Sequence, residues 1–201
     1  MQSSNTKAAR TRQFIIEATA EVFNQKGYAG TSVSDLTTAT QLTKGSIYGN
    51  FENKEEVAAA AFDFNWGKIK KMIAVKIEKS TTAKDKLMAY TELYKNVANN
   101  TLLKGGCPIL NTAIEADDTN PLLRKKAAQA LIGWKNNIAG IIKEGIANGE
   151  FKEETPLQET ALSLIALIEG GIMIARLTGS MDYLSSIVKT AAQQIDAICT
   201  Q

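Results

Sequence analysis

Residues 43–50, the stretch TKGSIYGN, carry side chains suited to holding a nucleic acid. Lys44 supplies a positive charge, while Ser46 and Tyr48 supply hydroxyl groups that hydrogen-bond phosphates or base edges. The glycine at position 45 lowers the stability of a helix by about 1 kcal/mol relative to alanine. We therefore expect a short helix in which Gly45 lets the backbone approach DNA closely.

The composition of the chain argues against catalysis and metal binding. The 201 residues include no histidine, and the two cysteines, Cys107 and Cys199, lie far apart in the sequence. Ser-His-Asp and Cys-His catalysis are excluded, as are histidine-ligated zinc sites, and the carboxylates form no cluster. We expect a protein that is not an enzyme, with no catalytic residue, no metal and no cofactor.

Positive charge is concentrated in the first quarter of the chain. The net charge is +2 at pH 7. Residues 1–54 contain six lysines and arginines against four acidic residues, whereas the remainder is balanced. A positive excess in this segment favours a nucleic-acid partner.

Three helices are expected to position the segment around Lys44. Apolar residues recur with helical spacing over residues 9–26 and 33–40, and a short helix should cover about 44–50. Gly27 is expected to end the first helix. The inward-facing side chains of this helix-turn-helix would be Leu36, Leu42 and Ile47.

Hydroxyl side chains are placed to cap two of these helices. Thr31 or Ser32 is a suitable N-cap for the helix at 33–40, and Thr43 is one for the next helix. Backbone N–H groups at a helix start also attract phosphate, so these positions are candidates for contact with DNA.

The remainder of the chain has helical patterns and no convincing strand. Helices are expected over residues 54–79, 82–100, 107–115, 120–148, 156–178 and 181–199. About nine helices predict an all-α protein, with one domain at residues 1–53 and a larger one at 54–201. The longest apolar stretch is interrupted by Glu169, and residues 1–13 lack the apolar segment of a signal peptide. We expect no membrane partner and a cytoplasmic location.

The first third of the chain resembles a known family. The stretch TSVSDLTTATQLTKGSIYGNFENKEEVAAAAFD closely resembles the DNA-binding segment of TetR/AcrR-family transcriptional regulators. IIEATAEVFNQKGYAGTS resembles their first helix and the turn that follows it, so the similarity covers about residues 10–63. Gln41 stands where the family often has a turn glycine, and Asn50 stands where it often has histidine.

The resemblance implies a repressor with an N-terminal three-helix DNA-binding domain and a larger helical domain for ligand binding and dimerisation. It would bind a palindromic double-stranded DNA operator as a homodimer, and a small-molecule inducer would release it. The residues expected to face DNA are Thr31, Ser32, Thr43, Lys44, Gly45, Ser46, Tyr48, Asn50 and Lys54.

The last two helices have features of a dimer interface. Gly170, Gly171 and Ala175 permit close approach between helices, and Tyr183 and Ile187 add apolar surface on the final helix. Apolar residues are spread around both helices, so each is expected to bury one face on its own domain and one on a partner. The alternative is a buried core helix of a monomer.

Aromatic and polar residues of the C-terminal domain are candidates for the inducer pocket, and each could equally be a core residue. They are Trp66, Tyr90, Tyr94, Asn111 and Trp134. Cys107 is a further candidate, because GGCPILNTAIEADD resembles the Gly-Cys segment of one TetR-family subgroup, some members of which sense electrophiles or oxidants. The start of a helix favours a thiolate there, but a free cysteine is more often a small buried hydrophobe.

Three classes of function therefore compete. The leading prediction is a regulator, released by an inducer or alternatively by oxidation of Cys107. An all-α enzyme or carrier is a second class, although no catalytic apparatus is present. A constitutive DNA-architectural protein is the third, but it would not need a large C-terminal domain.

Overall fold

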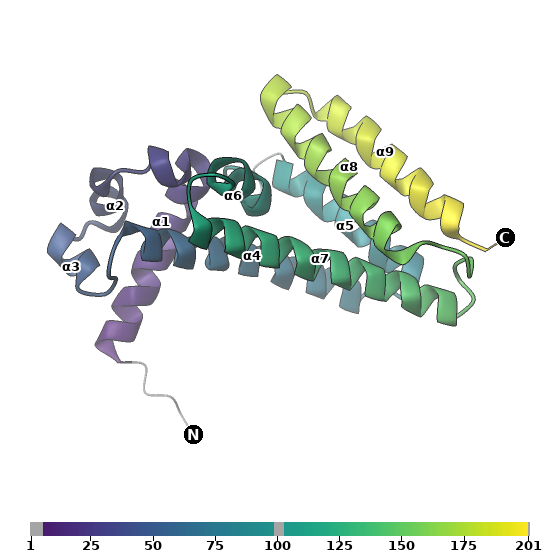
Figure 1. The fold of residues 1–201 in the computed structure, drawn as a ribbon, viewed down its shortest axis with the longest axis horizontal. Helices are drawn as coiled ribbons and strands as arrows, with labels where there is room; N and C mark the ends of the chain where they lie inside the picture. The colour runs from purple at the N-terminus through teal and green to yellow at the C-terminus, as the bar shows by residue number, and fades with distance from the viewer. Residues whose placement is uncertain (1–5, 99–102, 201) are drawn as a thin grey trace. The chain divides into compact units, whose positions relative to one another are not determined.

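The computed structural model describes residues 6–98 and 103–200, which form nine α-helices (Figure 1). They are α1 (Lys7–Gly30), α2 (Val33–Thr40), α3 (Lys44–Tyr48), α4 (Lys54–Glu78), α5 (Ala83–Ala98), α6 (Pro108–Ala116), α7 (Pro121–Ala147), α8 (Leu157–Thr178) and α9 (Met181–Ile198). These residues contain no strand, and one isolated β-bridge joins Phe151 to Cys199. The prediction of an all-α protein is confirmed.

The helices divide into two compact units. The first unit contains residues 6–68 and 103–128, so α6 and the start of α7 pack with the N-terminal helices. The second contains residues 69–98 and 129–200. The expected domain limits, residues 1–53 and 54–201, stay a prediction.

The core of the first unit holds the short helix α3 in place. Leu36 of α2 and Ile47 of α3 are fully buried, and Leu42 between them is half-buried against the same cluster. Phe51, which follows α3, is also buried there. A helix of five residues is not stable by itself. Burying a large apolar side chain stabilises the folded state by about 1.5–3 kcal/mol, and this burial holds α3 on the domain.

α1 is interrupted near its end. The sequence predicts a helix that stops at Gly27, and the backbone there is indeed non-helical, with φ 72° and ψ 177°. One further helical turn then continues to Gly30. This combination of positive φ and extended ψ is what requires glycine, and a Cβ atom at position 27 would also displace the Glu115 carboxylate, whose Oε2 lies 2.5 Å from that position.

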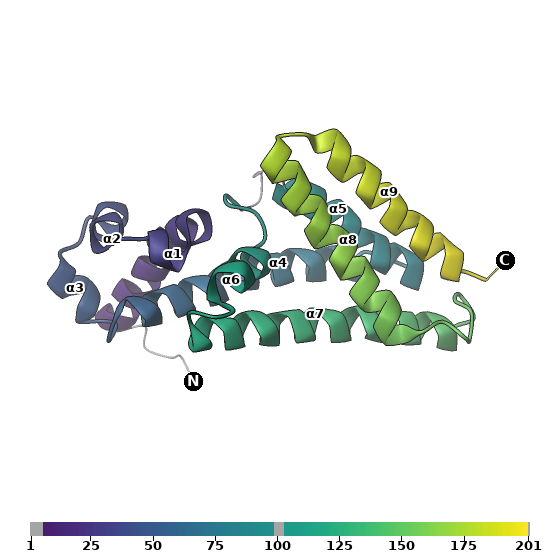
Figure 2. The same cartoon turned by 45° about the horizontal axis from the view of Figure 1, so that its top comes forward.

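In the second unit, α8 and α9 lie side by side, and α5 packs against both (Figure 2). Gly171 permits this contact, because a Cβ atom there would lie 2.9 Å from Cδ1 of Leu184. Ala175 is buried as well. Two of the small residues expected at a dimer interface therefore pack within the chain.

α8 is long and apolar enough to cross a membrane, judged by length and composition alone. Half of its most apolar window is buried inside the structure. Core helices of soluble proteins meet the same criterion, so this feature is weak support for a membrane span.

Candidate nucleic-acid interface

Polar caps fix the starts of α2 and α3. Ser32 is the N-cap of α2: its hydroxyl accepts the N–H of Asp35 at 3.1 Å, and the Asp35 carboxylate accepts the N–H of Ser32 at 2.8 Å. Thr43 caps α3 by accepting the N–H of Ser46 at 3.1 Å. These bonds satisfy donors that a helix start leaves unpaired. Of the two candidates at the start of α2, Ser32 is the cap and Thr31 is not.

The turn between α2 and α3 contains a left-handed residue. Gln41 has φ 56° and ψ 25°, and it is the only non-glycine residue with positive φ among those the structure describes. Its side-chain amide donates to the carbonyl of Thr38 at 2.7 Å. The tight turn therefore forms with glutamine where glycine is common, at a strain of about 1 kcal/mol.

The N-terminal end of α3 presents an open surface. Lys44 and Gly45 are exposed, and Ser46 and Tyr48 are half-buried. A Cβ atom at Gly45 would have no neighbour closer than Oγ1 of Thr43, 4.0 Å away. Packing within the chain gives no reason for a glycine here, which agrees with the expected close approach of DNA.

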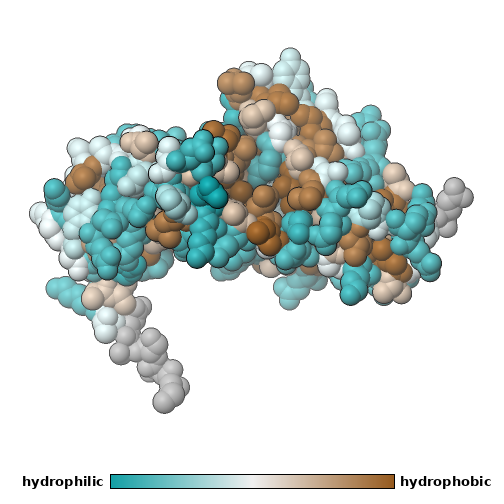
Figure 3. All heavy atoms as spheres, viewed as in Figure 1, coloured by the Kyte–Doolittle hydropathy of each residue, from teal (hydrophilic) through white to brown (hydrophobic). Residues whose placement is uncertain are grey.

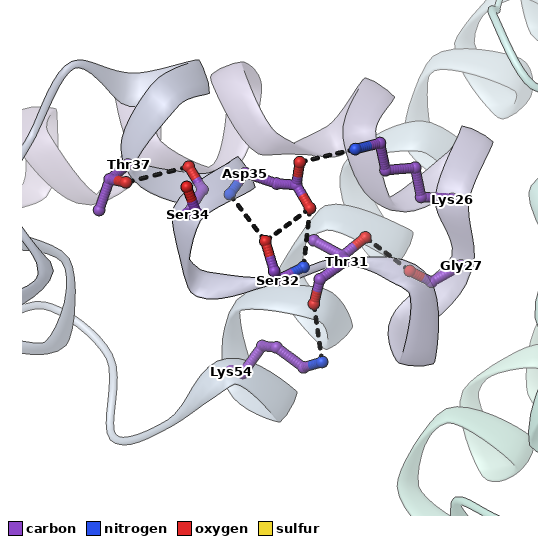
Figure 4. A network of polar contacts seen from close by, with 8 residues as sticks. All are labelled: Lys26, Gly27, Thr31, Ser32, Ser34, Asp35, Thr37 and Lys54. Atoms are coloured by element: carbon purple, nitrogen blue, oxygen red, sulfur yellow. Dashed lines mark hydrogen bonds and ion pairs between the residues drawn. The ribbon is translucent and has the colours of Figure 1, made fainter.

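Thr31 and Lys54 take part in a polar network beside the start of α2 (Figure 4). Thr31 is fully buried, and its hydroxyl donates to the carbonyl of Gly27 at 2.6 Å. Lys54 Nζ donates to the carbonyls of Tyr28 and Thr31, at 2.7 and 2.8 Å, and lies 4.2 Å from the centroid of the Tyr28 ring. The side chain of Thr31 is thus bonded within the chain, and that of Lys54 joins the end of α1 to α4; the expected contacts of both residues with DNA stay predictions.

Asn50 closes the other end of α3. Its side-chain amide donates to the carbonyl of Ser46 at 2.9 Å. Its own carbonyl accepts from Arg12 of α1 at 2.6 Å. Asn50 therefore pairs a carbonyl of the last turn from just beyond Gly49, the C-cap of α3, and its expected contact with a phosphate stays a prediction.

A surface ion pair joins α1 to α2. Lys26 Nζ lies 2.6 Å from Oδ1 of Asp35, and the hydroxyl of Ser32 donates to the other carboxylate oxygen at 2.8 Å (Figure 4). The bond with Lys26, followed by those with Ser32, lowers the pKa of Asp35 to about 2. The carboxylate that caps α2 therefore stays ionised at all physiological pH values.

A polar joint that the sequence did not reveal ties α1 to the chain around α6. Asn24 Nδ2 donates to the carbonyls of Lys104 and Gly106, at 2.7 and 3.0 Å. In the opposite direction, Asn111 Nδ2 of α6 donates to the backbone carbonyl of Asn24 at 3.0 Å. The side chain of Asn111, expected in an inducer pocket, is thus bonded to the DNA-binding segment.

Glu115 of α6 completes this joint by capping the last turn of α1. Its carboxylate accepts the N–H groups of Tyr28 and Ala29, at 2.7 and 2.6 Å. An anion at a helix start is favoured by the unpaired donors and the helix dipole. In the sequence, only the glycines at positions 27 and 105 hinted at this joint. The structure shows that both have positive φ and lie close to the opposite element.

The remaining pocket candidates are divided between the two units. In the second unit, the ring of Trp134 stacks on those of Tyr94 and Tyr90, with centroids 4.8 and 6.2 Å apart. Burial raises the pKa of Tyr90 to about 12, so its phenol stays neutral. Trp66 and Cys107 belong to the first unit. Cys107 is 0% exposed, which fits the alternative of a small buried hydrophobe, and the cysteine-sensor alternative is not favoured.

Two family models match the chain. The model for bacterial regulatory proteins of the tetR family matches residues 15–61, and the tetracyclin repressor-like C-terminal domain matches residues 83–191. This chain belongs to the TetR family. It is a DNA-binding transcriptional regulator, as predicted from TKGSIYGN and its flanks, and such regulators are soluble and generally not enzymes.

Relatives of this TetR-family regulator agree with the assignment. The fatty acid metabolism regulator protein of Bacillus subtilis (strain 168) is 31% identical over 140 residues, 69% of this chain and 70% of that protein. The HTH-type transcriptional repressor DhaR of Mycobacterium sp. (strain GP1) is 25% identical over 182 residues, 90% of each chain. A TetR-family regulator from Cytophaga hutchinsonii has a solved structure with 51% identity and a TM-score of 0.95, covering 99% of this chain and 100% of that one.

Proposed function

We propose that this regulator is a repressor that binds a palindromic operator through two α3 helices, one from each subunit of a homodimer. The observation that carries the proposal is the open surface at Lys44 and Gly45, where α3 offers a cation beside a position without a side chain. Cations and backbone groups at the start of a recognition helix suit phosphates and base edges. The relative named as a repressor supports negative regulation.

Binding to the DNA upstream of its own gene tests this proposal. Lys44→Ala should lower affinity about tenfold, because one good base contact contributes about 1–3 kcal/mol. Lys70→Ala is the matched control, since Lys70 is an exposed lysine on α4. Affinity should fall steeply with salt for the wild type. Wild-type protein without sequence-specific, salt-dependent binding would overturn the proposal.

The dimer is proposed to form through an exposed apolar stripe on α8 together with α9. The stripe repeats at helical spacing: Leu162, Ala166, Gly170, Met173 and Leu177. Leu177 is 83% exposed and Tyr183 on α9 is 54% exposed. Figure 3 shows hydrophobic residues gathered over these helices. An apolar stripe of this kind is typical of an interface. Gly170 lies within it with no atom near its missing Cβ, and Ile187 of α9 is half-buried.

The inducer is proposed to bind against the stack of Tyr90, Tyr94 and Trp134, because aromatic walls are typical of small-molecule sites. The chain has two tryptophans, so Trp66→Phe leaves Trp134 as the only one. Inducer binding should then change its fluorescence and release the operator. A fatty acid is the first probe, since the Bacillus relative is named as a fatty acid metabolism regulator protein. Release of DNA without a change at Trp134 would place the inducer elsewhere.

A further inference from the structure

Arg12 of α1 contacts the segment of the chain that follows α3. One guanidinium nitrogen donates to the carbonyl of Asn50 at 2.6 Å, and the other donates to Oε1 of Glu56 at 2.7 Å. The Cζ atom of Arg12 lies over the ring of Phe51, 3.9 Å from the ring centroid. One side chain thus contacts Asn50 just after the recognition helix, the buried Phe51 that follows it, and the first turn of α4.

Glu56 adds two further hydrogen bonds across the turn between α3 and α4. Its second carboxylate oxygen accepts the N–H of Glu52 at 2.7 Å, and its own N–H donates to the side chain of Asn53 at 2.9 Å. The pKa of Glu56 lies below its usual value, chiefly through the N–H of Glu52 and also through Arg12. Every bond in this network fixes the path of residues 50–56.

The C-terminal end of α3 is closed locally by the N–H of Gly49, which donates to the carbonyl of Gly45 at 2.9 Å, and by the side chain of Asn50; the network of Arg12 and Glu56 ties that end to α1 and α4. The helix has five residues, and Thr43 fixes only its N-terminal end. Ile47 and Phe51 bury their side chains, which sets the depth of the helix, but apolar contacts are not directional. A planar guanidinium with two charge-assisted bonds is directional, so it sets the angle at which α3 leaves the domain.

We propose that Arg12 is a positioning residue for operator recognition: it fixes the direction of α3 through Asn50, Phe51 and Glu56 without contacting DNA. The inference rests on the proposed operator binding by α3. The competing role is a phosphate contact, since Arg12 is a cation near the start of α1. A third role is stability alone.

Two DNA measurements separate these roles. The wild-type protein first selects a specific duplex from random-sequence DNA, and a scrambled duplex of the same composition measures non-specific binding. For Arg12→Met, the ratio of specific to non-specific affinity should fall about tenfold, because misdirected side chains lose base contacts. The dependence of log affinity on log salt should stay unchanged, because no phosphate contact is lost. Arg12→Lys should also lower the ratio, since lysine cannot make both bonds and stack.

Arg10→Met is the matched control. Arg10 is exposed on the same helix and has no described side-chain bond to α3, so its loss removes equal charge and should leave the ratio unchanged. A salt slope that falls by about 1 in Arg12→Met, with the ratio intact, would show a phosphate contact and overturn the inference.

A stability role also has its own signature. A lower unfolding midpoint in Arg12→Met and Arg12→Lys with an intact ratio would overturn the inference, because fewer folded molecules weaken both kinds of binding equally. Wild-type protein that selects no specific duplex would instead refute the proposed operator binding, and the inference with it.

Discussion

Gly45 is the residue at which stability and function are expected to oppose each other. It is exposed in α3, and the chain leaves room for a Cβ atom there. Gly45→Ala should therefore raise the free energy of unfolding by about 0.5–1 kcal/mol. The same methyl group should lower operator affinity, because it keeps the backbone away from DNA. Chemical unfolding and DNA titration of one preparation measure both effects.

Gly67 provides the control for this substitution. It lies within α4, and a Cβ atom there would also meet open space. Gly67→Ala should raise stability by a similar amount and leave operator affinity unchanged. If Gly45→Ala binds the operator as tightly as the wild type, the prediction that DNA closely approaches the backbone at this glycine is wrong.

Between elements, the contact of α1 with α2 should respond to acid. The folded-state pKa of Asp35 is about 2, below the ordinary value of 3.8. Its contribution to stability is therefore complete above about pH 4 and is lost as the pH falls through about 2. The difference in unfolding free energy between wild type and Asp35→Asn should be largest at pH 5 and shrink towards pH 2. Lys26→Met should weaken this pH dependence, and an equal difference at both pH values would contradict it.

The joint between α1 and α6 should depend on one carboxylate. Glu115→Ala removes the acceptor for the N–H groups of Tyr28 and Ala29, and should lower the free energy of unfolding by about 1–2 kcal/mol. Amide hydrogen exchange at those two positions should accelerate, because their donors lose protection. Asp118→Ala is the control, since Asp118 is exposed and makes no described side-chain bond. Unchanged exchange at Tyr28 would show that the cap is dispensable.

For the whole molecule, association is expected to depend on the stripe of α8. Leu177 is 83% exposed, so Leu177→Glu should not disturb the subunit itself. It should convert the dimer to monomer in sedimentation experiments and abolish tight operator binding, because one α3 helix reads only one half-site. Ile114→Glu adds the same charge at a residue of α6 that is 65% exposed, and should leave the dimer intact. A Leu177→Glu dimer would place the interface elsewhere.

The sequence by itself determined the helices, the cap at Thr43, the buried pair Leu36 and Ile47, and the family. These features depend on residues a few positions apart, because helical periodicity and capping act within one or two turns. A local pattern can therefore be recognised from the residue types alone.

Tertiary structure decided which polar side chains face outward. Thr31 and Ser32 are equally good caps in sequence, but the packing of Thr31 against the turn at Gly27 buries it. Lys54 carries a charge that suits phosphate, yet it bonds two backbone carbonyls at the end of α1. The partners of Arg12 and Glu115 lie far away along the chain. Any of many charged residues could have made those contacts, so only the folded arrangement of the helices selects them.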